Sequence, residues 1–304
     1  MMLRLKSVDA DTLQRARALA PRVFESPLRH SWPLHLTVVV MAGLALYCLW
    51  LFEASPLRIW NGLGELVRIV GHMFPPTAKG MAWEYVASMA QTVGMAFIGT
   101  VLAAVLAVPL GMLGARNVLP NWLARFLFRR SSDVLRGVDQ LIWALIFVRA
   151  VGLGPLAGIL AIIVSDTGTL AKLYSEAVEN TDKRPVDGVR ACGGGRLHAV
   201  RFGILPQVLP VMLSNALYIF ESNTRSATIL GIVGAGGIGF FLSDRIRTLN
   251  WEEASFIMLL ILITVYIIDA LSKWIRMQLI RGPQTGAVPA QRPDAGRAPA
   301  SAAH

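Results

Sequence analysis

Six long runs of apolar residues limit what this chain can fold into. The first, Leu34–Phe52, has about 19 residues without a charged side chain, and as a helix it would extend roughly 28 Å. That length matches the hydrocarbon core of a lipid bilayer. The other five runs are Tyr85–Leu113, Val134–Val151, Leu156–Tyr174, Val208–Asn223 and Ala254–Ile275. The pattern predicts an all-α membrane protein with about six transmembrane helices.

The composition supports lipid as the solvent of this chain. Only 16% of its 304 residues are charged, whereas a soluble domain has about 25%. The net charge of +10 does not indicate a nucleic-acid partner, because the Lys and Arg residues cluster between the apolar runs. Such clusters are typical of the cytoplasmic loops of membrane proteins. The lipid bilayer is therefore an expected partner, and nucleic acid is not.

The placement of Lys and Arg also predicts the orientation. With six crossings, the loops Arg116–Arg136 and Lys183–Arg201 and the segment Lys273–Arg281 lie on the same side as the N-terminus, and all three are basic. The opposite loops, Glu53–Glu84 and Asp244–Glu253, mix both signs. The excess of positive charge on the inner side therefore predicts that both termini are cytoplasmic.

The chain divides into segments along these lines. The first apolar run begins too far from the N-terminus for a cleavable signal, so we expect a retained helix. Residues 57–74 have apolar residues at helical spacing, which favours a helix on the membrane surface, with a packed helical hairpin as the alternative. The tail after Arg281 has too little apolar surface to fold. The expected segments are a cytoplasmic tail (1–33), a first transmembrane helix (34–53), a periplasmic segment with the interfacial helix (54–84), a core (85–280) and a disordered tail (281–304).

The polar interval Asp187–Pro210 is the strongest candidate for a docking element. It predicts a helical piece at Val186–Cys192, a three-glycine break at Gly193–Gly195 and a second basic piece at Arg196–Arg201. Its spacing resembles the cytoplasmic coupling loop of ABC importer permeases, with an ordinary cytoplasmic loop as the alternative. The resemblance places this loop at residues 180–204. It implies that an ATPase subunit is contacted by Asp187, Gly188, Arg190, Gly193, Leu205 and Pro206.

A second resemblance extends from Tyr85 to Gly282. The glycine-rich run Gly231–Gly239, the turn Gly152–Gly158 and the segment Lys172–Glu176 are similar to the phosphonate-importer branch of these permeases. The family implies a type I, methionine-importer-like architecture in the bacterial inner membrane. It also implies a homodimer, two ATP-binding subunits and an external substrate-binding protein. The expected solute is a phosphonate or a related phosphorus oxyanion such as phosphate or phosphite, and methionine is the alternative.

The glycine-rich run also indicates where a solute path could lie. It begins about 19 residues after Pro206, so the fifth crossing has either just spanned the bilayer or broken inside it. Irregular backbone at membrane depth either lines a path or is packed in protein, and both alternatives stay open. An anion in hydrocarbon needs positive charge or hydrogen-bond donors. The expected path residues are Arg225, Ser226, Thr228, Gly231 and Gly234.

No pattern in the sequence indicates catalysis, a metal or a cofactor. Gly234–Gly239 matches G-x-G-x-x-G, but it lies between membrane helices and not between a strand and a helix. There is no Gly-Lys dipeptide for a P-loop, no His-Glu-x-x-His and no Gly-x-Ser-x-Gly. A membrane-embedded enzyme is therefore the weaker hypothesis. We expect ATP hydrolysis to reside on a partner subunit.

Ionisable residues inside the apolar runs are further functional candidates. Glu221 and Arg225 are spaced four residues apart and are expected to pair. Asp269 and Lys273 have the same spacing and are interpreted as structural. Asp166 lies partway through an apolar run, and its partner cannot be predicted from the sequence.

Overall fold

The computed structural model describes residues 32–52, 55–118 and 121–280, and within these ranges every regular element is a helix. The chain divides after Gly71 into two units. Most of the predicted N-terminal tail, residues 1–31, and all of the predicted disordered tail, residues 281–304, lie outside the described residues.

The first unit consists of two consecutive helices, α4 (Trp32–Leu51) and α5 (Pro56–His72). Helix α4 confirms the helix predicted for the first apolar run. Helix α5 confirms the helix predicted over residues 57–74, and a Glu65–Arg68 ion pair of 2.8 Å lies on its polar side. Its exposed apolar side chains recur at helical spacing. They are Leu57, Trp60, Leu63, Leu66, Val67 and Val70. The location of α5 on a membrane surface stays a prediction.

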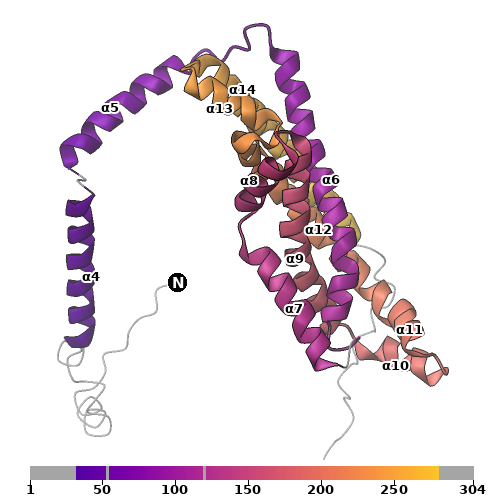
Figure 1. Cartoon of the computed structure of the whole chain (residues 1–304). Helices are drawn as coiled ribbons and strands as arrows, with labels where there is room; N and C mark the ends of the chain where they lie inside the picture. Colours follow the sequence, from indigo (N-terminus) through magenta and orange to yellow (C-terminus); the bar gives the residue numbers. More distant parts are fainter. Residues whose placement is uncertain (1–31, 53–54, 119–120, 281–304) are drawn as a thin grey trace, which may run out of the picture. The chain divides into compact units, whose positions relative to one another are not determined.

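The second unit is a helical bundle (Figure 1). Its elements, in chain order, are α6 (Ala82–Gly114), α7 (Trp122–Gly137), α8 (Gln140–Val151), α9 (Pro155–Glu179), α10 (Lys183–Ala191), α11 (Arg196–His198), the π-helical turn η1 (Ala199–Ile204), α12 (Leu205–Leu230), the π-helical turn η2 (Gly231–Ala235), α13 (Ile238–Arg247) and α14 (Trp251–Ile280).

The core of this bundle is the contact between α6 and α9. Small residues let the two backbones approach closely, as is common between membrane helices. A Cβ atom on Gly99 would lie 2.6 Å from Cγ2 of Ile162, and one on Gly111 would lie 2.7 Å from Cβ of Tyr174. The Tyr174 hydroxyl then donates a 3.3 Å hydrogen bond to the carbonyl of Met212 on α12. Three of the long helices are thereby joined at one level.

Four helical stretches of the described chain are long and apolar enough to cross a membrane. They are Ala82–Gly114, Pro155–Glu179, Arg196–Ala235 and Trp251–Leu279. The third of these runs continuously through α11, η1, α12 and η2. Two shorter apolar helices, His35–Leu51 and Gln140–Val151, correspond to the remaining predicted crossings. The prediction of an all-α membrane protein is confirmed.

The third predicted crossing, Val134–Val151, is wrong as a single helix. Helix α7 ends at Gly137, and α8 begins only at Gln140. Asp139 separates them in an extended conformation, and its carboxylate accepts a 2.8 Å hydrogen bond from the backbone N–H of Leu141. An aspartate that caps a helix start in this way ends the preceding helix. The run was predicted as one helix because most of its residues are apolar.

The fifth predicted crossing, Val208–Asn223, is too short at its outer end. Helix α12 continues to Leu230, so Arg225 lies inside a regular helix and not at a break. The break falls instead at Gly231–Gly237, where three glycines have positive φ. Arg225, Ser226 and Thr228 keep helical geometry because no glycine or proline interrupts the chain between Pro210 and Gly231.

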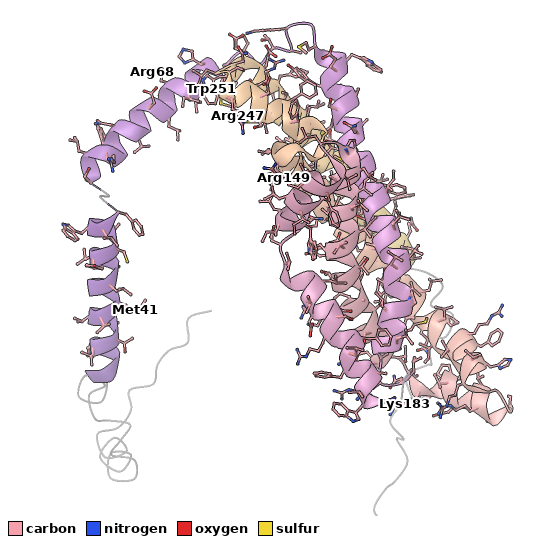
Figure 2. All side chains as sticks on the ribbon, in the orientation of Figure 1. Met41, Arg68, Arg149, Lys183, Arg247 and Trp251 are labelled. Atoms are coloured by element: carbon pink, nitrogen blue, oxygen red, sulfur yellow. The ribbon has the colours of Figure 1, made fainter. Side chains whose placement is uncertain are left out.

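The two ends of the second unit carry different loops. Figure 2 places Lys183, at the start of α10, at one end, and Arg247 and Trp251 at the opposite end. The predicted inner loop Lys183–Arg201 and the predicted outer loop Asp244–Glu253 are therefore separated by the length of the bundle. Which of the two ends faces the cytoplasm stays a prediction.

Candidate functional site

The predicted docking element is a short helical hairpin. Helix α10 begins after Asp182, whose carboxylate accepts a 3.0 Å hydrogen bond from the backbone N–H of Arg184. The helix ends in the three predicted glycines. Gly193 has φ +83°, a conformation that glycine adopts without strain, and its N–H donates to the carbonyl of Arg190 at 2.9 Å. The predicted helical pieces and the break between them are confirmed.

The hairpin is held tightly against the start of α12. A Cβ atom on Gly203 would lie 3.0 Å from Cα of Val186, so glycine at this position lets η1 contact α10. The side-chain amide of Gln207, on α12, both accepts from and donates to Asp182, the residue that caps α10. It accepts from the N–H of Asp182 at 3.1 Å and donates to the Asp182 carbonyl at 3.2 Å. The start of α10 is therefore hydrogen-bonded directly to α12, the third long membrane helix.

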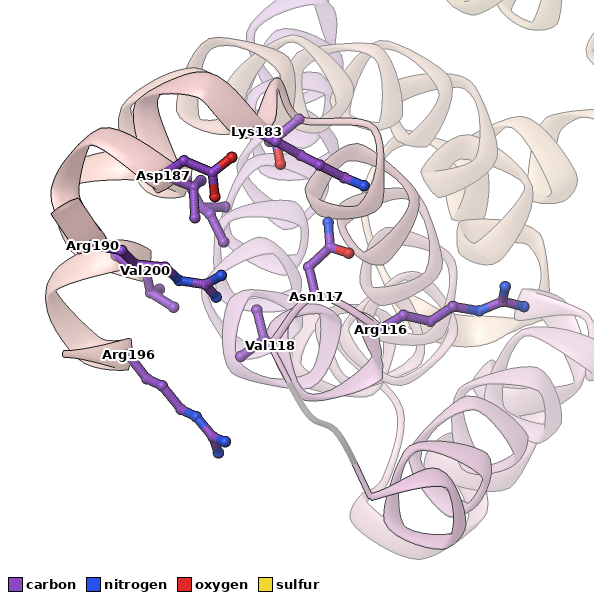
Figure 3. Close-up of a pocket in the computed structure, with 12 residues that line it drawn as sticks. Arg116, Asn117, Val118, Lys183, Asp187, Arg190, Arg196 and Val200 are labelled. Carbon is purple, nitrogen blue, oxygen red and sulfur yellow. The ribbon is translucent and has the colours of Figure 1, made fainter. Parts of the chain in front are cut away.

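A cleft of about 290 Å³ lies behind α10 (Figure 3). Asp187 and Arg190, two of the predicted coupling residues, line it. The opposite wall comes from the turn after α6, which contributes Arg116 and Val118. Part of the predicted coupling set therefore faces the protein's own cleft.

The other predicted coupling residues have different surroundings. Gly188 and Gly193 are exposed, and a Cβ atom on either would meet nothing within 4 Å. Both glycines therefore leave open surface that a partner subunit could contact. Leu205 packs against the core, and Pro206 is exposed near the start of α12. The structure brings the six residues to one end of the bundle, but not to one surface.

The charged residues of α12 and α14 form one cluster. Arg225 lies 3.9 Å from Glu221, as the spacing predicts, but it lies closer, 3.3 Å, to Asp269 of α14. Glu221 has its shorter contact with Arg276, at 2.8 Å. The interpretation of Asp269 as a structural partner within its own helix misses this cross-helix pairing. Four charges, two of each sign, therefore join α12 to α14.

The glycine break after α12 is packed in protein. A Cβ atom on Gly239 would lie 1.9 Å from the carbonyl oxygen of Thr228, and one on Gly237 would lie 2.3 Å from Oγ1 of Thr92. The break is also hydrogen-bonded, because the N–H of Gly154 donates to the Gly234 carbonyl at 3.1 Å. Of the two alternatives for this segment, tight packing has direct support. A role in a solute path stays a prediction.

The five predicted path residues do not share one environment. The Arg225 side chain is half exposed and directed toward α14. Ser226 is partly buried, whereas Thr228 and Gly231 are buried in the contact with α13. Gly234 has φ +98° and lies against Leu153 of the turn between α8 and α9. Arg225 is thus the one member of the set with a charged group accessible from outside the packed break.

A buried polar layer in the middle of the bundle escaped the sequence reasoning. The Asn223 amide donates to the Asp166 carboxylate and, at 2.8 Å, to the hydroxyl of Thr100. Its carbonyl oxygen accepts a 3.3 Å hydrogen bond from Gln140. Four helices, α6, α8, α9 and α12, thus meet at one asparagine that is 4% exposed. The partner of Asp166, which the sequence left open, is Asn223.

A signal for Asn223 was available in the sequence. It continues a series of inward-facing positions on α12, Ile219, Ala227 and Leu230, at intervals of three or four residues. A polar residue inside such an apolar series is costly in a membrane unless it finds a partner. Asp166, which also lies inside an apolar run and had no predicted partner, was a candidate to pair with Asn223.

A second missed cluster lies at the end of the bundle opposite α10. Glu253, 5% exposed, accepts a hydrogen bond from the Tyr85 hydroxyl and pairs with Arg245 at 2.9 Å. Hydrogen bonding to the Tyr85 oxygen raises the pKa of Arg245 above its ordinary value, so the guanidinium stays charged. These residues come from α6, α13 and α14, and they hold the three helices together.

Among the residues that the structure describes, no group of three or more His, Cys, Asp or Glu side chains could hold a metal ion. Both cysteines, Cys48 and Cys192, are free.

Sequence comparison places residues 107–282 in a family model described as "Binding-protein-dependent transport system inner membrane component". The chain is 39% identical over 241 residues to the phosphate-import permease protein PhnE of Mycolicibacterium smegmatis, an alignment that covers 79% of this chain and 45% of that protein. It is 35% identical over 242 residues to the phosphite transport system permease protein PtxC of Stutzerimonas stutzeri, covering 79% of this chain and 87% of that protein. The chain thus spans less than half of the first relative and most of the second.

Comparison of structures gives a match with a chain of the MetNI methionine ABC transporter in an inward-facing conformation. The TM-score is 0.57 with 22% sequence identity, and the alignment covers 67% of this chain and 99% of that chain. At this identity the match shows the fold alone. It agrees with the predicted methionine-importer-like architecture.

Proposed function

Because this chain belongs to the family of binding-protein-dependent transport system inner membrane components, we propose that it is the permease subunit of an ATP-driven importer for phosphonates or related phosphorus oxyanions, such as phosphate and phosphite. The observation that carries the solute class is the identity of 35–39% to phosphate and phosphite permeases over 79% of the chain. The likeness to a methionine transporter, at 22% identity, supports the fold and not the solute.

The experiment that tests the solute class is competition for uptake. Vesicles with the assembled importer and its binding protein would take up labelled methylphosphonate, with unlabelled phosphite, phosphate or methionine added in excess. We expect the phosphorus compounds to compete and methionine to have no effect. Competition by methionine alone would assign the transporter to the alternative class.

The partners that we propose follow from the same family. They are a second copy of this chain, two ATP-hydrolysing subunits and an external substrate-binding protein. We propose that ATP hydrolysis resides on the partners, because the matched relatives carry the names of permease subunits. The bundle contributes the membrane path, and α10 with its glycine turn contributes the contact with the ATPase.

The proposed topology has six crossings with both termini in the cytoplasm. Single cysteines would be introduced at Ala78, Thr248, Arg125 and Arg190 of a chain in which Cys48 and Cys192 are replaced by serine. In intact cells, a membrane-impermeant thiol reagent should label the positions at Ala78 and Thr248 only. The other two should react only after the membrane is opened, and labelling at Arg190 in intact cells contradicts the topology.

The proposed contact with the ATPase can be tested at Gly193. Gly193→Glu strains an exposed turn locally, because φ is positive there, but the added Cβ meets no atom within 4 Å, so the bundle should still insert and fold. An unpaired charge forced into an interface costs about 2–5 kcal/mol, so we expect uptake to fall more than about tenfold. Gly193→Asn is the matched control, because asparagine tolerates the same positive φ without adding charge. Equal uptake by both variants refutes the contact.

The proposed path can be tested at Arg225. A guanidinium recognises tetrahedral oxyanions through paired N–H donors, and this one is half exposed. Arg225→Gln should lower uptake about tenfold, the loss expected for one charge-assisted hydrogen bond of about 1.5 kcal/mol. Lys273→Gln removes one positive charge from α14 without touching Arg225, and it should have little effect.

A structural role for Arg225 makes a different prediction. The charge swap Arg225→Asp with Asp269→Arg would keep the ion pair between α12 and α14. We expect the swapped protein to assemble but to transport poorly. Restoration of uptake by the swap would show that the pair is structural, and Arg225 would then leave the proposed path.

A further inference from the structure

The cleft behind α10 has the composition of an anion site. Its lining carries four cationic side chains and one carboxylate, Asp187. The cations come from three separate segments of the chain: the turn after α6, helix α10 and helix α11. They are Arg116, Lys183, Arg190 and Arg196.

Most of this positive charge is not used inside the described protein. Arg116 lies 3.9 Å from Glu179, but the structure shows no ion pair or hydrogen bond for the side chains of Lys183, Arg190 and Arg196. The amide of Asn117 is already committed, since it donates to the carbonyls of Val178 and Glu179. The free donors of the cleft are therefore cationic.

Apart from Thr181, whose hydroxyl donates to the Val178 carbonyl at 2.8 Å, the remainder of the lining is apolar. Ala199 and Ile204 are buried at the floor, and Val118, Val186 and Val200 stand beside them. Figure 3 shows Lys183 and Arg190 extending toward the turn that carries Asn117 and Val118, while Arg116 and Arg196 extend away at the edges. A volume of about 290 Å³ equals roughly ten water molecules in the liquid. The cleft thus has room for a small anionic head and a few further atoms.

We propose that this cleft binds an anionic phosphorus group attached to a small uncharged part. Lys183 and Arg190 contact the phosphorus oxygens, and the valines contact the uncharged part. Two sources supply this chemistry: the head group of an anionic lipid at the inner membrane surface, and a free phosphonate or phosphate in the cytoplasm. Asp187 disfavours a dense anion such as a polyphosphate, because it places a negative charge on the same wall.

Occupancy of the cleft has a mechanical consequence. A ligand held by α10 and by the turn after α6 would link two separate segments of the chain. Because α10 is also tied to α12 through Gln207, the ligand would restrain the element proposed to contact the ATPase. This consequence rests on the proposed function, whereas binding itself does not.

The test measures binding to the purified full-length chain. Inorganic phosphate and methylphosphonate would be titrated in detergent, with binding followed by ³¹P line broadening. In a second arm, the chain in nanodiscs of phosphatidylglycerol or of phosphatidylcholine would be analysed for retained lipid. We expect Arg190→Gln to weaken binding about tenfold, the effect of one charge-assisted hydrogen bond. Arg184→Gln, one residue from Lys183 but outside the lining, should bind as the wild type does.

Each outcome decides the proposal. Saturable binding of phosphate that depends on Arg190 supports the site and identifies a free oxyanion. Retention of phosphatidylglycerol that depends on Arg190, without phosphate binding, supports the site and identifies the lipid. Absence of both, or equal binding by Arg190→Gln and Arg184→Gln, overturns the proposal. Since uptake is not measured, this result is independent of the solute class of the importer.

Discussion

Gly239→Ala should strongly destabilise the assembled bundle. The added Cβ atom would lie 1.9 Å from the carbonyl oxygen of Thr228, an atom of the backbone that cannot rotate away. Relief requires α13 to move from α12, which opens the packed break at Gly231. Overpacking of this kind costs about 3 kcal/mol or more, so we expect the thermal denaturation midpoint in detergent to fall by roughly 10 °C.

The matched control is Gly94→Ala on α6. A Cβ atom there meets nothing within 4 Å, so the change adds a methyl group without a clash. Alanine also favours a helix over glycine by up to about 1 kcal/mol, and the control should be as stable as the wild type or slightly more stable. Equal stability of Gly239→Ala and Gly94→Ala would show that α12 and α13 do not pack as described.

Asn223→Leu should destabilise the middle of the bundle by about 3 kcal/mol, because a buried carboxylate loses its hydrogen-bond partner. Leucine has the same number and branching of side-chain heavy atoms as asparagine, so the change opens no cavity, and the loss reports mainly on the unpaired Asp166. The measurement is the denaturation midpoint of the purified protein. The yield of monodisperse protein should fall with it.

The double variant Asn223→Leu with Asp166→Leu separates this explanation from a packing fault. Removing both polar partners leaves no unpaired charge, and such replacements are often neutral. We expect the double variant to recover most of the stability lost by Asn223→Leu. If it is less stable than both single variants, the two side chains do not act as a pair.

Local sequence patterns predict the helices of this protein well, because a chain inside a membrane must satisfy its backbone hydrogen bonds internally. A run such as Ala254–Ile275 has no water to satisfy its backbone, so a helix is the available solution, and α14 extends over Trp251–Ile280. The glycine turn at Gly193–Gly195 was predictable for a related reason. Glycine adopts the positive φ that ends α10, and Gly193 does so.

Long-range pairings could not be predicted in the same way. Arg225 has Glu221 four residues away, and the spacing favours that pair, yet Asp269 of another helix lies closer. Which carboxylate lies closer to Arg225 depends on the angle at which α12 and α14 cross. The periodicity of residues within one helix carries no information on that angle. The break at Val138–Asp139 is a different case. The sequence contains the capping aspartate, Asp139, but the apolar residues on both sides favoured the prediction of one continuous helix.

The π-helical turn η1 is a position where related chains can differ by one residue in length. A π-helical turn holds one residue more than an α-helical turn, and one residue corresponds to about 100° of helical phase. Deletion of a single residue within Ala199–Ile204 would convert the wide turn to ordinary α-helix, while Gly193 and Pro206 keep their roles on either side. Relatives that lack one residue between the glycine turn and the proline are therefore expected to place their gap here. Their faces on α11 and α12 would then align only when the two helices are compared separately.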